Sequence, residues 1–157
     1  MKKITFKVDG LVREVEVRDS ELLIETLRER LGLLGTKYSC LEGDCGVCTV
    51  IMGGKNVLSC LLLSADCDGE DILTIEGLVK DGQPHQLQKS FVEKGAVQCG
   101  FCTPGMILAA KVLLDKNPDP SDKEIERAID GNLCRCTGYI KIIEAVKDAS
   151  EKINKKG

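Results

Sequence analysis

Hydrophobic and polar residues alternate with a period of two at the start of the chain. Residues 4–8 place Ile, Phe and Val at every second position, and residues 15–17 repeat the alternation with valine. The Asp9–Gly10 pair between them is a strong signal for a tight hairpin turn. Because successive side chains of a strand point to opposite faces, this pattern predicts two antiparallel strands with one buried face.

The spacing of apolar positions then changes from two to four, which predicts a helix over residues 21–31. Leucines recur on one side of this helix, at Leu23, Leu27 and Leu31. Asp19 or Ser20 is expected to cap its start, because a side-chain oxygen there can accept a hydrogen bond from a free backbone N–H group. Gly32 is expected to end the helix.

Residues 35–48 show no periodicity and hold three glycines and three cysteines, which indicates a loop wrapped around a site. Short strands are expected over residues 49–52 and 56–60, joined by a Gly-Gly-Lys turn, and a last strand is expected around Leu73 and Ile75. Two strands, a helix and further strands make an α+β pattern.

No strand pattern appears from His85 onward, and helices are expected instead. They cover residues 87–94, 104–116, 121–130 and 139–153. The second of these segments is apolar nearly all round, which predicts that it is buried. A turn-rich stretch at residues 81–84 separates the two patterns, so we expect one domain over residues 1–80 and a helical domain over residues 84–157.

Composition and charge narrow the class of protein. The 157 residues carry a net charge of −3, which excludes the basic surface typical of a nucleic-acid-binding protein. No apolar run is long enough for a signal peptide or a membrane span, so we expect a cytoplasmic protein without a span. The nine cysteines fall mostly in short-spaced groups. In a cytoplasmic protein that pattern indicates metal binding or redox chemistry rather than disulfides.

The first thiol group opens with the spacing C-x4-C-x2-C of plant-type 2Fe-2S proteins, formed by Cys40, Cys45 and Cys48. The fourth ligand lies downstream, at either Cys60 or Cys67. A three-residue hairpin turn at residues 53–55 would place Cys48 opposite Cys60, so Cys60 is the expected fourth member and Cys67 has no role. Zinc is the alternative, although zinc motifs more often pair two C-x2-C units.

The second thiol group combines a C-x2-C pair with a C-x-C pair, formed by Cys99, Cys102, Cys134 and Cys136. Each pair precedes an expected helix, with Pro104 after the first pair and Thr137–Gly138 after the second. Helix N-termini present free N–H groups and a partial positive charge, which stabilise an anionic cluster. A zinc site, a redox-active C-x2-C pair and structural cysteines are the alternatives.

Together these motifs closely resemble the small iron–sulfur subunit of the xanthine dehydrogenase family, the molybdenum hydroxylases. The resemblance rests on the first thiol group, on residues 98–106 (QCGFCTPGM) and on residues 131–139 (GNLCRCTGY), in that order along almost the whole chain. One departure is Ser39, because the family often has glycine directly before the first cluster cysteine.

The resemblance implies a fold and a set of cofactors. An N-terminal plant-ferredoxin-like β-grasp domain would hold one 2Fe-2S cluster on the first thiol group. A C-terminal four-helix-bundle domain would hold a second 2Fe-2S cluster on the second thiol group. Gln98 and Cys136 would approach a molybdopterin-type molybdenum cofactor on a large partner subunit. FAD would lie on a medium partner subunit, in a dimer of heterotrimers.

The function implied is electron transfer from the molybdenum centre through the two clusters to FAD. The substrate chemistry and the choice of substrate would belong to the large subunit, with no catalytic residue on this chain. Two other classes stay open at this point. One is a stand-alone zinc module that scaffolds other proteins, and the other is a free ferredoxin-like carrier.

Overall fold

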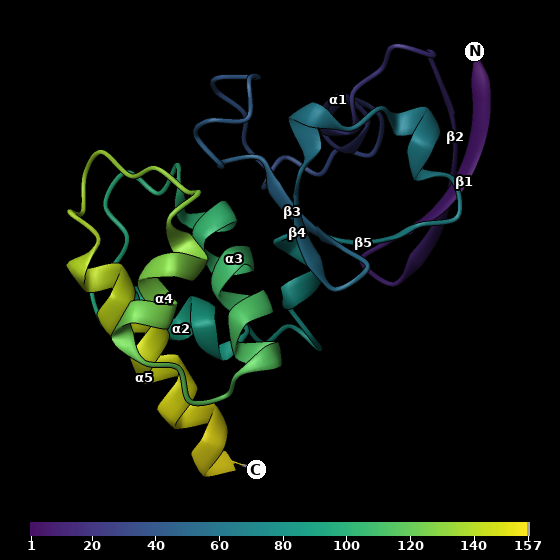
Figure 1. The fold of residues 1–157 in the computed structure, drawn as a ribbon. Helices are drawn as coiled ribbons and strands as arrows, with labels where there is room; N and C mark the ends of the chain where they lie inside the picture. The colour runs from purple at the N-terminus through teal and green to yellow at the C-terminus, as the bar shows by residue number, and fades with distance from the viewer. Residues whose placement is uncertain (157) are drawn as a thin grey trace.

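Five strands form one mixed sheet in the first half of the chain. In this computed structural model, which describes residues 1–156, they are β1 (Lys2–Val8), β2 (Leu11–Val17), β3 (Thr49–Met52), β4 (Lys55–Leu58) and β5 (Asp71–Leu73). Their order in the sheet is β2-β1-β5-β3-β4. β5 runs parallel to β1 and antiparallel to β3, so the last strand joins the two hairpins into one sheet (Figure 1).

The first hairpin forms as the alternation predicts. Ile4, Phe6 and Val8 are buried on one face of β1, while the residues between them are exposed. Asp9 and Gly10 both have positive φ, which is the backbone of the tight turn expected from this pair. The buried face packs against helical residues and Ile72 of β5 to form the core of the sheet.

The helix expected over residues 21–31 starts later and is less regular. The structure has a short α1 (Leu23–Glu25) that continues as a π-helical turn, η1 (Thr26–Arg30). The prediction of a cap by Asp19 or Ser20 is wrong, because the Glu25 carboxylate instead accepts the N–H of Leu22 at 2.8 Å. The leucines at every fourth position are nevertheless on the inner side, as predicted, and Leu23 and Leu27 are fully buried.

The hairpin of β3 and β4 has a shorter turn than expected. Gly53 and Gly54 alone connect the strands, and Met52 pairs with Lys55. The predicted three-residue turn is therefore wrong by one residue, and Cys48 lies opposite Ser59 rather than opposite Cys60. β4 ends at Leu58, and short 3₁₀ turns follow at η2 (Ser59–Leu61), η3 (Ser64–Cys67) and η4 (Glu76–Leu78).

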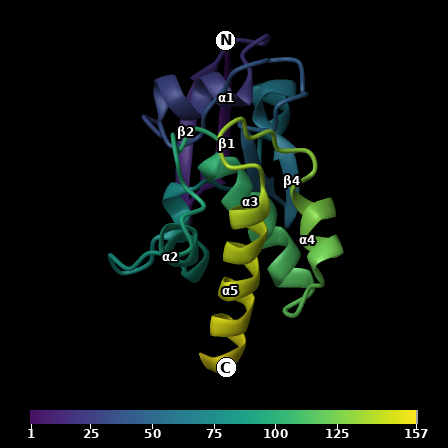
Figure 2. The same ribbon diagram turned by 90° about the vertical axis from the view of Figure 1, so that its left-hand side faces the viewer.

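Four helices follow in the second half of the chain, close to the predicted segments. They are α2 (Gln86–Glu93), α3 (Thr103–Lys116), α4 (Asp122–Ile129) and α5 (Ile140–Lys156). Figure 2 shows α5 in front, with α2 and α4 on either side, and α5 packs against both of these helices. Among the described residues, none of the helices is both long enough and apolar enough to cross a membrane.

The helices share a core with one side of the sheet. α3 packs on β3 and β4 and is buried on most sides, as its apolar sequence predicts. Along β3, Val50 lies in the core of the sheet, while its neighbour Ile51 lies in the core of the helices. Val47, which lies between Cys45 and Cys48 in the first thiol loop, joins the same helical core. β3 therefore separates the two cores and contributes to both.

Candidate metal centres

The first thiol group lies on the long loop before β3 and on the 3₁₀ turn after β4. The Cys40 sulfur accepts backbone N–H groups from Glu42 at 3.5 Å and from Cys45 at 3.4 Å. These N–H groups, together with the Cys45 thiol, lower the pKa of Cys40 to about 6. The loop therefore stabilises a thiolate at this position, which is the form that binds metal.

Cys48 and Cys60 form the buried side of the same site. Both side chains are almost fully buried and pack with Ile24 in a small apolar cluster. Burial and the neighbouring Cys48 thiol raise the pKa of Cys60 to about 12. Although the strand register differs from the predicted one, η2 turns the chain so that Cys60 still lies beside Cys48. Cys67 lies apart from them, buried in the core of the sheet.

The second thiol group surrounds a hollow of about 490 Å³, and all four of its cysteines line that hollow. Cys102 is the residue before α3, and Pro104 occupies the first turn, as predicted. Burial and the adjacent Cys134 thiol raise the pKa of Cys102 to about 12. The other two members, Cys99 and Cys136, contact each other at the exposed rim of the hollow.

The Cys134 sulfur accepts hydrogen bonds from Thr137, three residues further along the chain. The Thr137 hydroxyl donates to this sulfur at 3.1 Å and the Thr137 N–H donates at 3.5 Å. Burial raises the pKa of Cys134, but these hydrogen bonds outweigh it and the net pKa is lowered. The last helix begins at Ile140, one residue later than predicted, because Gly138 and Tyr139 both have positive φ.

Tyr139 holds the loop of the second thiol group in shape. Its hydroxyl oxygen accepts the backbone N–H of Cys134 at 2.9 Å. Local sequence patterns do not reveal this contact, because an aromatic residue before a helix is ordinarily a packing residue. The C-x-C spacing is the one sequence signal here, because it indicates a tight loop whose backbone N–H groups need hydrogen-bond acceptors.

In both groups the thiols lie in contacting pairs. These pairs are Cys40 with Cys45, Cys48 with Cys60, Cys102 with Cys134, and Cys99 with Cys136. Among the described residues, no three His, Cys, Asp or Glu side chains form a ready site for a single metal ion. A 2Fe-2S cluster takes four thiolates on two irons, so two pairs of thiols with backbone N–H donors fit its donor set.

A direct hydrogen bond joins the two candidate sites. The N–H of Leu133, next to Cys134, donates to the carbonyl oxygen of Cys45 at 2.9 Å. Cys45 and Ser39 of the first loop also line the hollow of the second thiol group. The two sites are therefore neighbours, although they lie about ninety residues apart in sequence, between Cys45 and Cys134.

Two polar residues lie at the surface of the second site. Gln98, the remaining predicted residue, is exposed beside Cys99, and Arg135 is exposed between two cysteines of the group. Four large apolar side chains are also exposed around the site, namely Val97, Phe101, Leu133 and Ile140. Exposed apolar side chains that gather beside polar residues are typical of an interaction surface.

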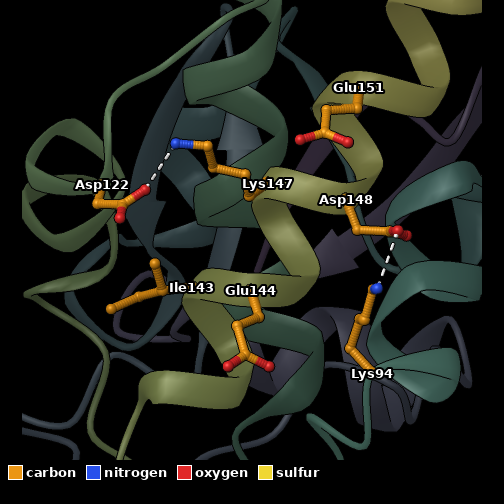
Figure 3. A pocket seen from close by; sticks show the side chains of 7 residues that line it. All are labelled: Lys94, Asp122, Ile143, Glu144, Lys147, Asp148 and Glu151. Carbon is orange, nitrogen blue, oxygen red and sulfur yellow. Dashed lines mark hydrogen bonds and ion pairs between the residues drawn. The ribbon is translucent and has the colours of Figure 1, made fainter.

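Another hollow, of about 300 Å³, lies along α5 and has a different character (Figure 3). Charged side chains line it, and ion pairs connect them across the helices. Lys147 contacts Asp122 at 2.8 Å, and Lys94 contacts Asp148 at 3.3 Å. These ion pairs connect α5 to the neighbouring helices, and no thiol lines this hollow, so it belongs to neither thiol site.

Comparison with known proteins matches this arrangement of two sites. Residues 6–74 match the family described as "2Fe-2S iron-sulfur cluster binding domain", and residues 74–147 match the family "[2Fe-2S] binding domain". The chain is 53% identical over 154 residues to the nicotinate dehydrogenase small FeS subunit of Eubacterium barkeri, covering 97% of this chain and 98% of that one. It is 42% identical over 149 residues to the xanthine dehydrogenase iron-sulfur-binding subunit of Escherichia coli O157:H7, covering 92% and 91%.

Solved structures agree with the sequence relatives. A chain of quinoline 2-oxidoreductase from Pseudomonas putida 86 superposes with a TM-score of 0.95 at 41% identity, covering 99% of this chain and 97% of that chain. The match extends over the sheet, the helices and both thiol groups. This chain therefore belongs to the small iron–sulfur subunits, with two 2Fe-2S domains, of the xanthine dehydrogenase family of molybdenum hydroxylases.

Proposed function

We propose that this chain relays electrons within a heteromeric molybdenum hydroxylase, from a molybdopterin centre on a large subunit to FAD on a medium subunit. The ligands would be the first thiol group (Cys40, Cys45, Cys48 and Cys60) and the second thiol group (Cys99, Cys102, Cys134 and Cys136). When bound, each 2Fe-2S cluster takes up and gives back one electron. The chain itself holds and tunes the clusters, and the substrate chemistry belongs to the large subunit.

The observation that carries this proposal is the hydrogen bond between Leu133 N–H and Cys45 O. It connects a residue adjacent to one proposed ligand with a proposed ligand of the other cluster, without an intervening side chain. Paired thiols in both sites support two-iron clusters. The two sites are therefore adjacent, as electron transfer from one cluster to the other requires.

The fold supports a division of labour between two domains. We assign residues 1–80 to a plant-ferredoxin-like β-grasp domain and residues 84–157 to a four-helix-bundle 2Fe-2S domain. The sheet of the first and the four helices of the second are consistent with this assignment. Cytoplasmic location and assembly as a dimer of heterotrimers complete the proposal.

Each site has a surface suited to a different partner. The second thiol group exposes Cys136 and Gln98 within an apolar rim, and we assign this face to the large subunit and its molybdenum cofactor. Near the first thiol group, Leu41 and Tyr38 are exposed, and we assign that face to the subunit with FAD. Relatives named as subunits of dehydrogenase complexes support the existence of such partners.

Metal analysis of the purified complex tests the ligand assignment. We expect about four irons per small subunit and visible absorption, since each 2Fe-2S cluster holds two irons. Cys60→Ser should remove about half of this iron, because it deletes a ligand of the first cluster. Cys67→Ser is the matched control and should retain all of it. Zinc in place of iron would overturn the proposal and favour a scaffolding module.

Cys136→Ala tests the direction of the relay. Substrate should still bind to the large subunit, whereas reduction of the first cluster by substrate should be lost or much slower. Stopped-flow spectroscopy of the assembled complex measures both. Unchanged turnover would contradict the proposed route, and purification of the wild-type chain as a lone monomer under gentle conditions would favour a free carrier.

A further inference from the structure

Asn132 is a buried polar residue at the junction of the two thiol loops. Its side chain is 5% exposed, although asparagine is ordinarily a surface residue. It belongs to the loop of the second thiol group, but its hydrogen bonds reach the loop of the first. We propose that Asn132 is a positioning residue that sets the separation and relative orientation of the two clusters. This inference rests on the proposed function of the chain as a two-cluster relay.

The side-chain amide of Asn132 donates to one group on the first loop and to one at the start of β3. Its Nδ2 donates to the carbonyl oxygen of Gly46 at 2.8 Å and to the hydroxyl oxygen of Thr49 at 3.2 Å. The Thr49 hydroxyl in turn donates to the same Gly46 carbonyl at 2.6 Å. Gly46 follows Cys45 directly, so Asn132 holds the peptide unit beside a proposed ligand of the first cluster.

The Asn132 amide acts together with the backbone hydrogen bond between the sites. Leu133 N–H donates to Cys45 O at 2.9 Å, so consecutive residues 132 and 133 bind consecutive residues 46 and 45. Two hydrogen bonds between two short segments fix both distance and rotation, whereas one bond leaves rotation free. Asn132 therefore supplies the second constraint on the loops.

Two glycines, Gly46 and Gly105, allow the loops to approach closely enough for these bonds. A Cβ on Gly46 would collide with the carbonyl oxygen of Gly131, and its φ of +71° also favours glycine. A Cβ on Gly105, at the start of α3, would lie 2.8 Å from Gly46 O and 3.1 Å from Asn132 Nδ2. The segment that follows Cys102 thus packs against the same contact. At both glycines a larger residue would push the loops apart and lengthen the hydrogen bonds of Asn132.

The test compares the assembled, cluster-loaded complex with Asn132→Ala and with a matched control. Asn154→Ala is the control, because Asn154 Nδ2 also donates to a backbone carbonyl, that of Pro118 at 2.9 Å, far from both sites. Electron paramagnetic resonance of the fully reduced protein measures the magnetic splitting between the two clusters. This splitting depends on their separation and orientation, whereas the signal of each cluster alone reports its own ligands.

We expect Asn132→Ala to retain about four irons per chain and both cluster signals, but to reduce or broaden the splitting and to slow electron transfer between the clusters. Asn154→Ala should match the wild type in all of these. A splitting and a transfer rate unchanged in Asn132→Ala would overturn the inference. Should that variant lose iron, Asn132→Leu takes its place, since leucine has a similar volume but donates no hydrogen bond to the Gly46 carbonyl. A changed splitting in Asn132→Leu supports the inference, and no change overturns it.

The same measurements separate this inference from the proposed function. A wild-type complex without iron or without two cluster signals contradicts the relay itself. A wild-type complex with both signals, whose splitting does not respond to either variant, contradicts only the role of Asn132.

Discussion

At the scale of single residues, the hydrogen bonds to each sulfur distinguish the two sites. Cys40 receives backbone N–H groups, while Cys134 receives both a hydroxyl and an N–H from one residue, Thr137. Donors to cluster sulfurs stabilise the more negative, reduced state and so raise the reduction potential. Individual side chains can therefore tune one cluster without affecting the other.

We predict that Thr137→Val lowers the potential of the second cluster. The substitution removes the hydroxyl donor at 3.1 Å from the Cys134 sulfur and keeps the branched shape. A net loss of about 1 kcal/mol corresponds to about 40 mV for one electron. A redox titration followed by paramagnetic resonance measures both clusters in one sample. The first cluster serves as the internal control, and a shift of both clusters together would contradict this local explanation.

Gly46→Ala should destabilise the fold more than a comparable substitution elsewhere. Gly54 is the matched position, because its φ of +74° is close to the +71° of Gly46 and a Cβ there meets nothing within 4 Å. Gly54→Ala is expected to cost about 1 kcal/mol of unfolding free energy through its backbone alone. Gly46→Ala adds a collision with backbone atoms and should cost at least about 2 kcal/mol more. Chemical denaturation measures the difference, and equal losses would contradict a collision.

At the scale of elements, the caps and short turns are what sequence patterns predict least well. The Asp9–Gly10 turn and the capping box of Ser121 and Glu124 were predictable because each signal is local and complete. The length of the turn at Gly53–Gly54 is not predictable from the sequence, because Lys55 is compatible with either a turn or a strand. The alternation of apolar and polar residues does not determine where the strand begins. Asn132 was missed because its partner Gly46 lies 86 residues away.

The start of α2 provides a pH-dependent contribution to stability. His85 Nδ1 accepts the N–H of Leu87 at 3.2 Å, which requires the neutral imidazole. Burial and then the charge of Lys111 lower the pKa of His85 from its usual 6.5, and the opposing charge of Asp115 does not compensate. The folded state therefore binds the proton less readily than the unfolded state. Its stabilisation is complete above pH 6.5 and decreases as the pH falls below that value.

His85→Asn tests this cap with a residue that caps helices but does not titrate. We expect the midpoint of thermal unfolding of the wild type to fall between pH 7.5 and pH 5.5 by more than that of His85→Asn. Circular dichroism at the two pH values measures both proteins. Identical pH dependence in the two would show that His85 makes no contribution. Comparison at equal pH removes the effect of the other titrating groups.

At the scale of the whole molecule, β3 joins the sheet and the helices into one folding unit. Val50 and Ile51 are adjacent, yet they lie in different cores, and Val47 also enters the core of the helices. The sequence of β3 predicts that neighbouring side chains point to opposite faces of the sheet. It does not predict that α3 covers the second face, because the position of α3 depends on tertiary packing.

We predict that the cluster-loaded chain unfolds in a single cooperative transition. Loss of the helices would expose Val47 and Ile51, and loss of the sheet would remove one wall of the helical core. Far-ultraviolet circular dichroism reports the helices, and visible absorption reports the clusters, so the two curves should coincide. Two separate transitions would show that the sheet and the helices are independent. Ile51→Ala should shift both signals together, by about 2–4 kcal/mol of stability, because it leaves a cavity between them.

The uneven exposure of the second thiol group has a consequence for the life of the protein before assembly. Cys102 is buried, whereas Cys99 and Cys136 stand open to solvent at the rim. Oxidants attack cysteine sulfurs according to their accessibility. A chain without its partner therefore exposes these two thiols to oxidants. If the large subunit covers this rim, as proposed, its binding would also shield Cys99 and Cys136 from oxidation.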